Sequence, residues 1–202
     1  MTAPRASERA SSADRSRAAR ASIALGGGAW ALLTLPLVGE GWSWPVVDAI
    51  GRAEPYRSLR ESLPGDPYAT GGALVGIAFL AIGLAMLPEL RRAGWGGSLL
   101  AWLVVAGAVV SPVSYLSADE RAPLHALWGS ESSLLVAIGA AGIAAAVTAG
   151  RDWPRWSRAL LACTLGVLVA GAAALGYYPH GCLVALAAEA AVLILRARPR
   201  RG

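Results

Sequence analysis

The chain has 202 residues, of which 55% are hydrophobic and 15% are charged, and its formal net charge is +5. Soluble domains contain roughly 45–50% apolar and about 25% charged residues, so this composition argues against a soluble globular protein. The arginines stand mostly at the ends of long apolar runs. That pattern is typical of a membrane protein and not of a nucleic-acid-binding surface, so a lipid bilayer is the expected surrounding and no nucleic acid is expected as a partner.

Residues 1–20 are rich in Ala, Ser and Arg and show no apolar periodicity. This composition predicts a disordered, basic arm in the cytoplasm. The apolar run at residues 21–38 follows directly, and a cleaved secretory signal is the alternative interpretation. The run is longer than a usual signal core and no Ala-x-Ala site follows it, so we interpret it as the first membrane span.

Residues 40–70 form the longest polar connection. Its tryptophans and tyrosines favour the headgroup region of a bilayer. The apolar residues between Val46 and Leu59 predict a short helix that lies on the membrane and is interrupted near Pro55.

Five further apolar runs complete the predicted transmembrane domain at residues 21–198, with spans at 71–87, 96–116, 132–149, 159–176 and 179–196. Gly72, Gly76 and Gly83 share one face of the second span, which indicates close packing against another helix. The last apolar run is short for the roughly 20 residues of a span, so its helix should begin near Pro179 and end near Arg196.

The arginines predict the orientation. They concentrate in the amino-terminal arm, the turns at 88–94 and 151–158, and the carboxyl-terminal tail, whereas the other three connections carry most of the acids. Because basic loops stay in the cytoplasm, this alternation predicts an all-α polytopic bundle of six spans in a bacterial inner membrane, with both termini cytoplasmic. A five-span chain would place one basic terminus outside. The same arginines would attract anionic lipids, although topology alone also accounts for them.

A shift of 61 positions aligns the second and third spans with the fourth and fifth. It places Leu74 on Leu135 and Trp95 on Trp156 without a gap. The alignment indicates a parallel repeat of two hairpins, and a chance match between spans rich in Ala, Leu and Val is the alternative.

Glu189 lies well inside the last predicted span, about 10 Å from its Arg196 end at 1.5 Å per residue. A charge at that depth costs at least a few kcal/mol, so the side chain should face protein or a cavity. One interpretation is a proton acceptor, a ligand-binding carboxyl or a catalytic acid. The other is a carboxyl that only joins helices through a hydrogen bond to a neighbouring Ser, Thr or Trp. Trp102, inside the third span, is a second candidate ligand contact.

His125 and His180 are the two histidines of the chain, and each precedes a predicted span on the outer side, where Glu131 also lies. These three residues are the candidate catalytic groups of an outward-facing acid–base site. Their spacing matches no metal-ligand motif, because residues 125 and 131 fall on different faces of a continuous helix, and no metal site is predicted. Histidines held by structural hydrogen bonds are the alternative.

Common catalytic and cofactor motifs are absent from the sequence. It has no HExxH, no GxSxG in a strand–turn–helix setting, no P-loop and no paired histidines within spans to bind haem. No cofactor is therefore expected, and a non-enzymatic protein is favoured.

The Pro123-Leu124-His125-Ala126 segment precedes the fourth span, and Pro179-His180-Gly181 precedes the sixth. This layout resembles the small six-span bacterial membrane proteins grouped as domains of unknown function. The resemblance covers most of the chain as a plan of spans. It implies the span count and assigns no catalytic residue.

Three functional hypotheses follow. The first is a membrane protein that binds or moves a small or lipidic ligand between its helices, with Glu189 as the polar contact. The second is a membrane enzyme whose outer site uses the two histidines and nearby acids. The third is an accessory subunit that packs against a larger membrane partner.

Overall fold

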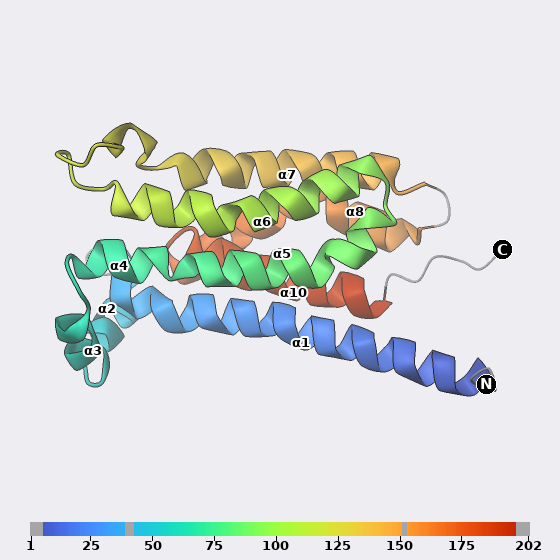
Figure 1. Cartoon of the computed structure of the whole chain (residues 1–202), viewed down its shortest axis with the longest axis horizontal. Helices are drawn as coiled ribbons and strands as arrows, with labels where there is room; N and C mark the ends of the chain where they lie inside the picture. Colours follow the sequence, from blue (N-terminus) through green and yellow to red (C-terminus); the bar gives the residue numbers. More distant parts are fainter. Residues whose placement is uncertain (1–5, 39–42, 151–152, 197–202) are drawn as a thin grey trace, which may run out of the picture.

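The structure, a computed structural model, describes residues 6–38, 43–150 and 153–196, with side chains from residue 12 onward. All secondary structure in these residues is helical. Figure 1 shows the long helices lying side by side along one axis. In chain order the elements are α1 (Ala6–Val38), α2 (Pro45–Arg52), α3 (Tyr56–Ser62), α4 (Pro67–Ala73), α5 (Val75–Arg91), α6 (Trp95–Leu116), η1 (His125–Leu127), α7 (Ser130–Thr148), α8 (Arg155–Ala162), α9 (Thr164–Leu175) and α10 (His180–Arg196).

In the described chain, 4 helical segments are long and apolar enough to cross a membrane, namely Ser12–Val38, Pro67–Arg91, Trp95–Leu116 and His125–Thr148. Helices α8 and α9 would form a fifth if the bent pair is one span. The prediction of an all-α protein with several membrane-spanning helices is thus confirmed at this coarser level.

Helix α10 begins at His180, close to the predicted start near Pro179, and its described part extends to Arg196. Its 17 residues fall short of the roughly 20 that a span needs, and it is not among the candidate spans. It packs against α1, α9 and α5. The sixth span therefore stays a prediction.

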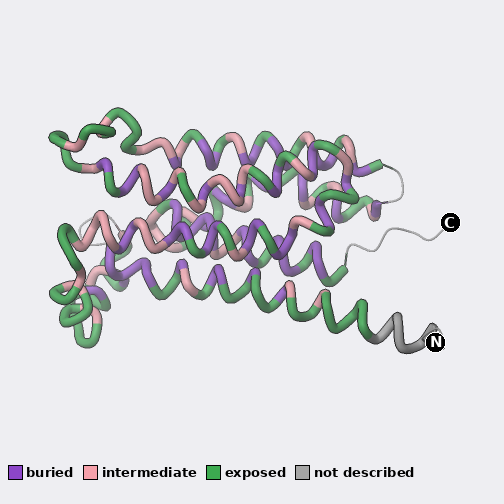
Figure 2. The backbone as a smooth tube through the Cα atoms, in the orientation of Figure 1, coloured by how far each residue is buried: buried purple, intermediate pink, exposed green. Residues whose placement is uncertain are grey.

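Apolar side chains cover the outside of the long helices as well as their inner faces. Val109 is 66% exposed, Val136 61% and Val147 72%. Figure 2 shows exposed positions along every long helix, interleaved with buried ones. Isolated soluble proteins rarely expose so much contiguous apolar surface, so this surface suits lipid chains.

The amino-terminal segment differs from the expected disordered arm. Residues 1–5 lie outside the described part, but residues 6–20 form the first turns of α1. A tertiary contact that the sequence pattern does not reveal lies at the end of this segment. Arg20 donates two hydrogen bonds to the buried carboxylate of Glu89 in the last turn of α5, and Arg92 lies 3.7 Å from the same group. This pairing compensates for the burial of the carboxylate and joins α1 to α5.

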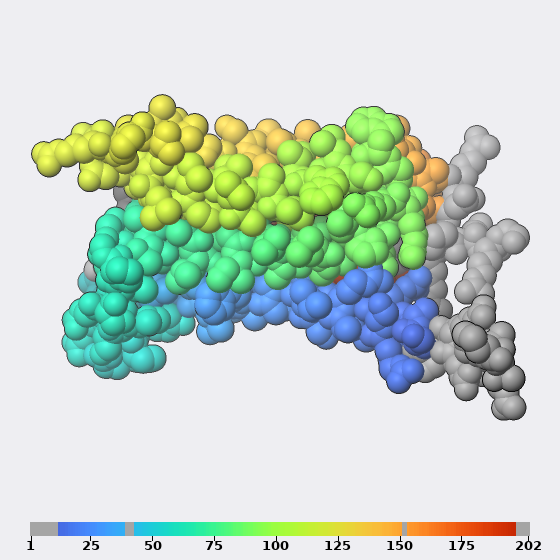
Figure 3. All heavy atoms as spheres, viewed as in Figure 1, coloured from blue at the N-terminus to red at the C-terminus, as the bar shows by residue number. Residues whose placement is uncertain are grey.

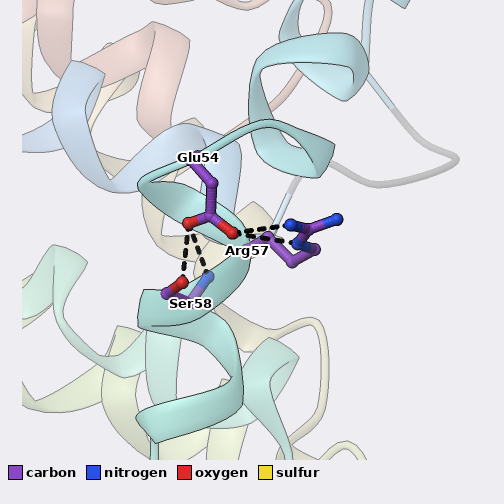
Figure 4. A network of polar contacts seen from close by, with 3 residues as sticks. All are labelled: Glu54, Arg57 and Ser58. Atoms are coloured by element: carbon purple, nitrogen blue, oxygen red, sulfur yellow. Dashed lines mark hydrogen bonds and ion pairs between the residues drawn. The ribbon is translucent and has the colours of Figure 1, made fainter.

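The connection between α1 and α4 contains two short helices, α2 and α3, separated near Pro55 as predicted. Glu54 accepts hydrogen bonds from the Ser58 hydroxyl at 2.6 Å and from Arg57, as Figure 4 shows. The Ser58 hydrogen bond, followed by that of Arg57, lowers the pKa of the exposed Glu54 carboxyl. Glu54 is therefore ionised at neutral pH and satisfies donors at the start of α3. Glu40 and Trp42 of this connection lie outside the described residues.

The predicted close packing at Gly72, Gly76 and Gly83 is confirmed. A Cβ atom on Gly76 would lie 2.9 Å from the Ala108 carbonyl oxygen of α6, and one on Gly83 would lie 2.9 Å from the Val105 nitrogen. Missing side chains thus allow α5 to contact the α6 backbone at Gly76 and Gly83, and allow α4 to contact the Tyr115 ring at Gly72.

The fifth apolar run is not one straight helix. It breaks at Cys163, where α8 and α9 are bent by 59°. The shift of 61 positions places Cys163 on Trp102, and α6 continues through Trp102 without a break. The two hairpins therefore differ in shape at this point, and the expected repeat stays a prediction.

The connections divide between the two ends of the bundle. The start of α1, the α5–α6 turn, the α7–α8 turn and the last turn of α10 gather at one end, and α2, α3 and the α6–α7 connection lie at the other (Figure 1). We call the end with the start of α1 and the last turn of α10 the arginine end. The opposite end, with α2, α3 and the α6–α7 connection, is the tyrosine end. Between them, side chains of α1, α5 and α6 fill the spaces between the ribbons on the face seen in Figure 3.

Candidate functional site

The tyrosine end contains a cavity of about 340 Å³, which we call the aromatic pocket. Pockets for drug-sized ligands measure roughly 300–1,000 Å³, so this one suits a small ligand. Its walls come from the start of α4, the end of α6, the start of α7 and the α9–α10 turn. The lining residues are Tyr68, Tyr115, Trp128, Gly129, Glu131, Tyr177 and Tyr178.

The tyrosines hold one another in place. The ring centroids of Tyr68 and Tyr115 are 5.2 Å apart, and the hydroxyl oxygens of Tyr115 and Tyr177 are 3.2 Å apart. Tyr115 fits against α4 because position 72 is glycine, where a Cβ atom would lie 2.0 Å from the ring. Burial raises the pKa of Tyr177, so its hydroxyl is neutral across the physiological range. The tyrosines therefore present uncharged aromatic surface.

The α6–α7 connection positions Trp128 over the pocket. His125 stacks on Trp128 with centroids 5.9 Å apart, and its Nδ1 atom lies 3.1 Å from the Ser117 carbonyl oxygen. Gly129 has φ of 81°, a conformation that glycine adopts without strain. Its backbone N–H donates to Ser114 Oγ at 2.8 Å. His125 thus has a structural role here.

Glu131 supplies the charged group of the pocket. It lies in the first turn of α7, where the helix dipole favours a carboxylate, and it is 5% exposed. Its Oε2 atom is buried and accepts no hydrogen bond from any described residue. A buried carboxylate oxygen without a partner is costly, so a partner from outside the chain is the natural explanation.

His180 lies behind the pocket and is fully buried. Its ring centroid is 5.5 Å from that of Tyr177 and 6.4 Å from that of Tyr115. Neither ring nitrogen has a hydrogen-bond partner among the described residues.

The three candidate catalytic residues show no direct contact with one another in the described chain. No hydrogen bond or ring contact within the described chain joins His125, Glu131 and His180 to one another. The described residues also contain no group of three or more His, Cys, Asp or Glu side chains that could hold a metal ion. The structure thus gives no support to the hypothesis of an outer catalytic centre.

Glu189 is buried as the sequence predicts, and it contacts the helix break. The Thr164 hydroxyl lies 2.8 Å from Glu189 Oε1 and also 2.8 Å from the Leu161 carbonyl oxygen. The hydroxyl donates to Glu189 Oε1, whereas the other carboxyl oxygen, Glu189 Oε2, is buried and has no hydrogen-bond partner among the described residues. The contact joins α10 to α9 and matches the interpretation of Glu189 as a residue that connects helices.

Trp102 lies away from the aromatic pocket. It is 50% exposed on the outside of α6, and the Arg91 guanidinium carbon is 5.9 Å from its ring centroid. This cation–π contact is a common arrangement near a membrane interface. Trp102 therefore shares no described cavity with Glu189.

The pocket tyrosines were not predicted as site residues from the sequence. The signal was present, because four of the five tyrosines of the chain line the pocket. Their positions, between 68 and 178, are too widely separated for any spacing motif to connect them.

Comparison with known proteins gives no match: no protein family, no curated protein and no solved structure is similar to this chain. The resemblance in layout therefore gains no support, and no residue role can be transferred from a relative.

Proposed function

We propose that the protein is a membrane protein that binds a small or lipidic ligand in the aromatic pocket. The observation that carries the proposal is the buried Glu131 Oε2 atom, which lacks a partner within the described chain and belongs to the pocket wall. Binding would supply that partner. Glu131 replaces Glu189 as the proposed polar contact because Glu131 lines the aromatic pocket, whereas Glu189, whose Oε2 atom also lacks a described partner, does not.

The proposal includes a topology of six spans in a bacterial inner membrane, with the arginine end in the cytoplasm. Its support is the alternation of basic and acidic connections, together with the position of the first turns of α1 and the last turn of α10 at the same end (Figure 1). The aromatic pocket would then open toward the outside.

Anionic lipids are proposed partners of the arginine end. Arg155 and Arg158 line a shallow groove of about 290 Å³ between α7 and α8, together with apolar residues such as Val147. Arg158 Nε donates to the Ala146 carbonyl oxygen at 3.1 Å, which fixes its guanidinium beside the groove. The phosphate of a lipid headgroup would pair with the arginines of the groove, and an acyl chain would pack against its apolar residues.

The ligand proposal is tested by thermal unfolding of the purified protein with a panel of small molecules. The panel contains alkylammonium ions, carboxylates, phosphates, sugars and neutral alcohols. We expect at least one class to raise the melting temperature, because a ligand that binds only the folded state stabilises it. We expect Glu131→Gln to abolish that rise.

Glu120→Gln is the matched control, since it removes an exposed acid from the same end of the bundle and does not line the pocket. It should leave the stabilisation unchanged. A panel with no stabilising class, or an equal rise in the Glu131→Gln variant, would contradict the proposal.

A further inference from the structure

The walls of the aromatic pocket define the chemistry of the ligand. Four tyrosine rings and one tryptophan ring surround a single carboxylate, that of Glu131. We propose that the ligand carries an organic ammonium group, held against the aromatic faces and paired with Glu131 Oε2. This inference rests on the proposed function and specifies the class of ligand.

Aromatic faces attract cations. The ring quadrupole makes the face of Trp or Tyr electron-rich, and recognition of quaternary ammonium groups by aromatic cages uses this attraction. The hydroxyls of Tyr115 and Tyr177 lie against each other, and Ser132 Oγ donates to the Tyr178 hydroxyl at 3.3 Å. With these hydroxyl contacts made within the protein, the rings remain as the surface offered to a ligand.

The charge of the pocket excludes an anionic ligand. Glu131 is the sole ionisable acid in its described wall, and no Arg or His belongs to that wall. An anion would meet the carboxylate without a compensating positive group. A cation would instead be attracted to the Glu131 carboxyl group by its charge, and the low-dielectric surroundings strengthen that attraction.

An inorganic cation fits less well. Calcium requires six to eight oxygen ligands and magnesium requires near-octahedral oxygen coordination. Among the described residues no group of three or more His, Cys, Asp or Glu side chains could hold a metal ion, and the pocket wall contains one carboxyl group. A bulky and weakly hydrated ammonium group matches a wide, aromatic wall.

The ammonium group can belong to a free molecule or to a lipid headgroup. Both sources share the same chemistry, and the tyrosine end lies where headgroups would lie in the proposed topology. A test must therefore begin without ammonium-bearing lipids and add each source separately.

Isothermal titration of the protein in phosphatidylglycerol nanodiscs, which contain no ammonium headgroup, provides this test. Choline and tetramethylammonium are the probes, and 3,3-dimethyl-1-butanol is the neutral isostere of choline. We expect choline to bind at least about tenfold more tightly than its isostere, because both fill the same volume and differ in charge. Dihexanoyl phosphatidylcholine compared with glycerophosphocholine then separates a lipid source from a soluble one.

Variants test the two parts of the cage. Glu131→Gln should weaken choline binding at least about tenfold and leave the isostere unchanged. Trp128→Leu should weaken it several-fold, whereas Trp128→Phe, which keeps an aromatic face, should retain most of the affinity. Glu120→Gln should behave as the unmodified protein, and circular dichroism confirms that each variant is folded.

The outcomes separate this inference from the proposed function. If choline and its isostere bind equally, or if only other classes of the panel stabilise the protein, the pocket binds ligands but the ammonium inference is wrong. If no probe and no panel class binds, the proposed function fails as well. Selective binding of the cation that depends on Glu131 and on an aromatic residue at position 128 supports both.

Discussion

At the scale of single residues, three buried carboxyls illustrate three different solutions to the cost of burial. Glu89 is paired with Arg20, Glu189 accepts from the Thr164 hydroxyl through Oε1 while its Oε2 atom has no described partner, and Glu131 Oε2 lacks a described partner at the wall of a cavity. Burying a charge or a polar group without a partner is costly, so each environment assigns a different role. The role of each acid thus depends on its neighbours and not on its residue type.

The contact between Glu189 and Thr164 makes a prediction at this scale. Thr164→Val should lower the free energy of unfolding by about 1–3 kcal/mol, because it leaves a buried carboxyl without its partner. Combining it with Glu189→Met should recover part of that loss, since both polar groups are then absent. Denaturation in detergent micelles measures both effects.

Glu189→Gln keeps a hydrogen-bonding group at this position and serves as the functional control. It should leave ligand-induced stabilisation unchanged. Loss of ligand response in Glu189→Gln, with Glu131→Gln unaffected, would return the ligand site to the middle of α10.

At the scale of elements, glycines decide how closely the helices approach. Gly72, at the end of α4, contacts the Tyr115 ring of α6 and so couples helix packing to the wall of the aromatic pocket. The break at Cys163 changes the direction of the chain, because α8 and α9 are bent relative to each other there. Thr164, the first residue of α9 after this break, contacts Glu189 of α10.

Gly72→Ala should destabilise the protein by about 1–3 kcal/mol, because the new Cβ atom would overlap the Tyr115 ring and force it to move. Gly26→Ala in α1 is the matched control, since a Cβ atom there meets nothing within 4 Å. The control should be neutral or stabilising by up to about 1 kcal/mol, because alanine favours a helix more than glycine does.

Thermal unfolding compares the two alanine variants, and ligand titration shows whether the pocket changes. Equal stability of Gly72→Ala and Gly26→Ala would mean that the Tyr115 ring is not held against α4 as the structure describes.

At the scale of the whole molecule, the arrangement of the two ends predicts the topology. In a background where Cys163 and Cys182 are replaced, Ser62→Cys at the tyrosine end should react with an impermeant maleimide in intact cells. Arg91→Cys at the arginine end should react only after the cells are permeabilised. Both positions are exposed, so a lack of reaction reports the membrane barrier and not burial.

Reporter fusions at the carboxyl terminus check the same prediction from the other side. A fluorescent protein fused to a cytoplasmic terminus should fold and fluoresce. Alkaline phosphatase fused to the same terminus should be inactive, because that enzyme needs export to become active. The reverse pattern would contradict an even number of spans.

The sequence alone determined the class of the protein, because hydropathy and helix-forming pattern are properties of adjacent residues. It predicted the apolar helices, the glycine face at Gly72 and Gly76, the start of α10 and the break near Pro55, and these are confirmed. The alternation of arginines likewise comes from local composition, since a bilayer sorts charge loop by loop.

Only the tertiary structure decided where a ligand site lies. Residues 68, 115, 131 and 177 belong to separate elements, and only helix packing brings their side chains to one cavity. The same holds for Arg20 and Glu89, which are 69 positions apart in the sequence and pair only in the folded chain. Contacts between distant residues depend on the geometry of the folded chain, and no local pattern contains that geometry.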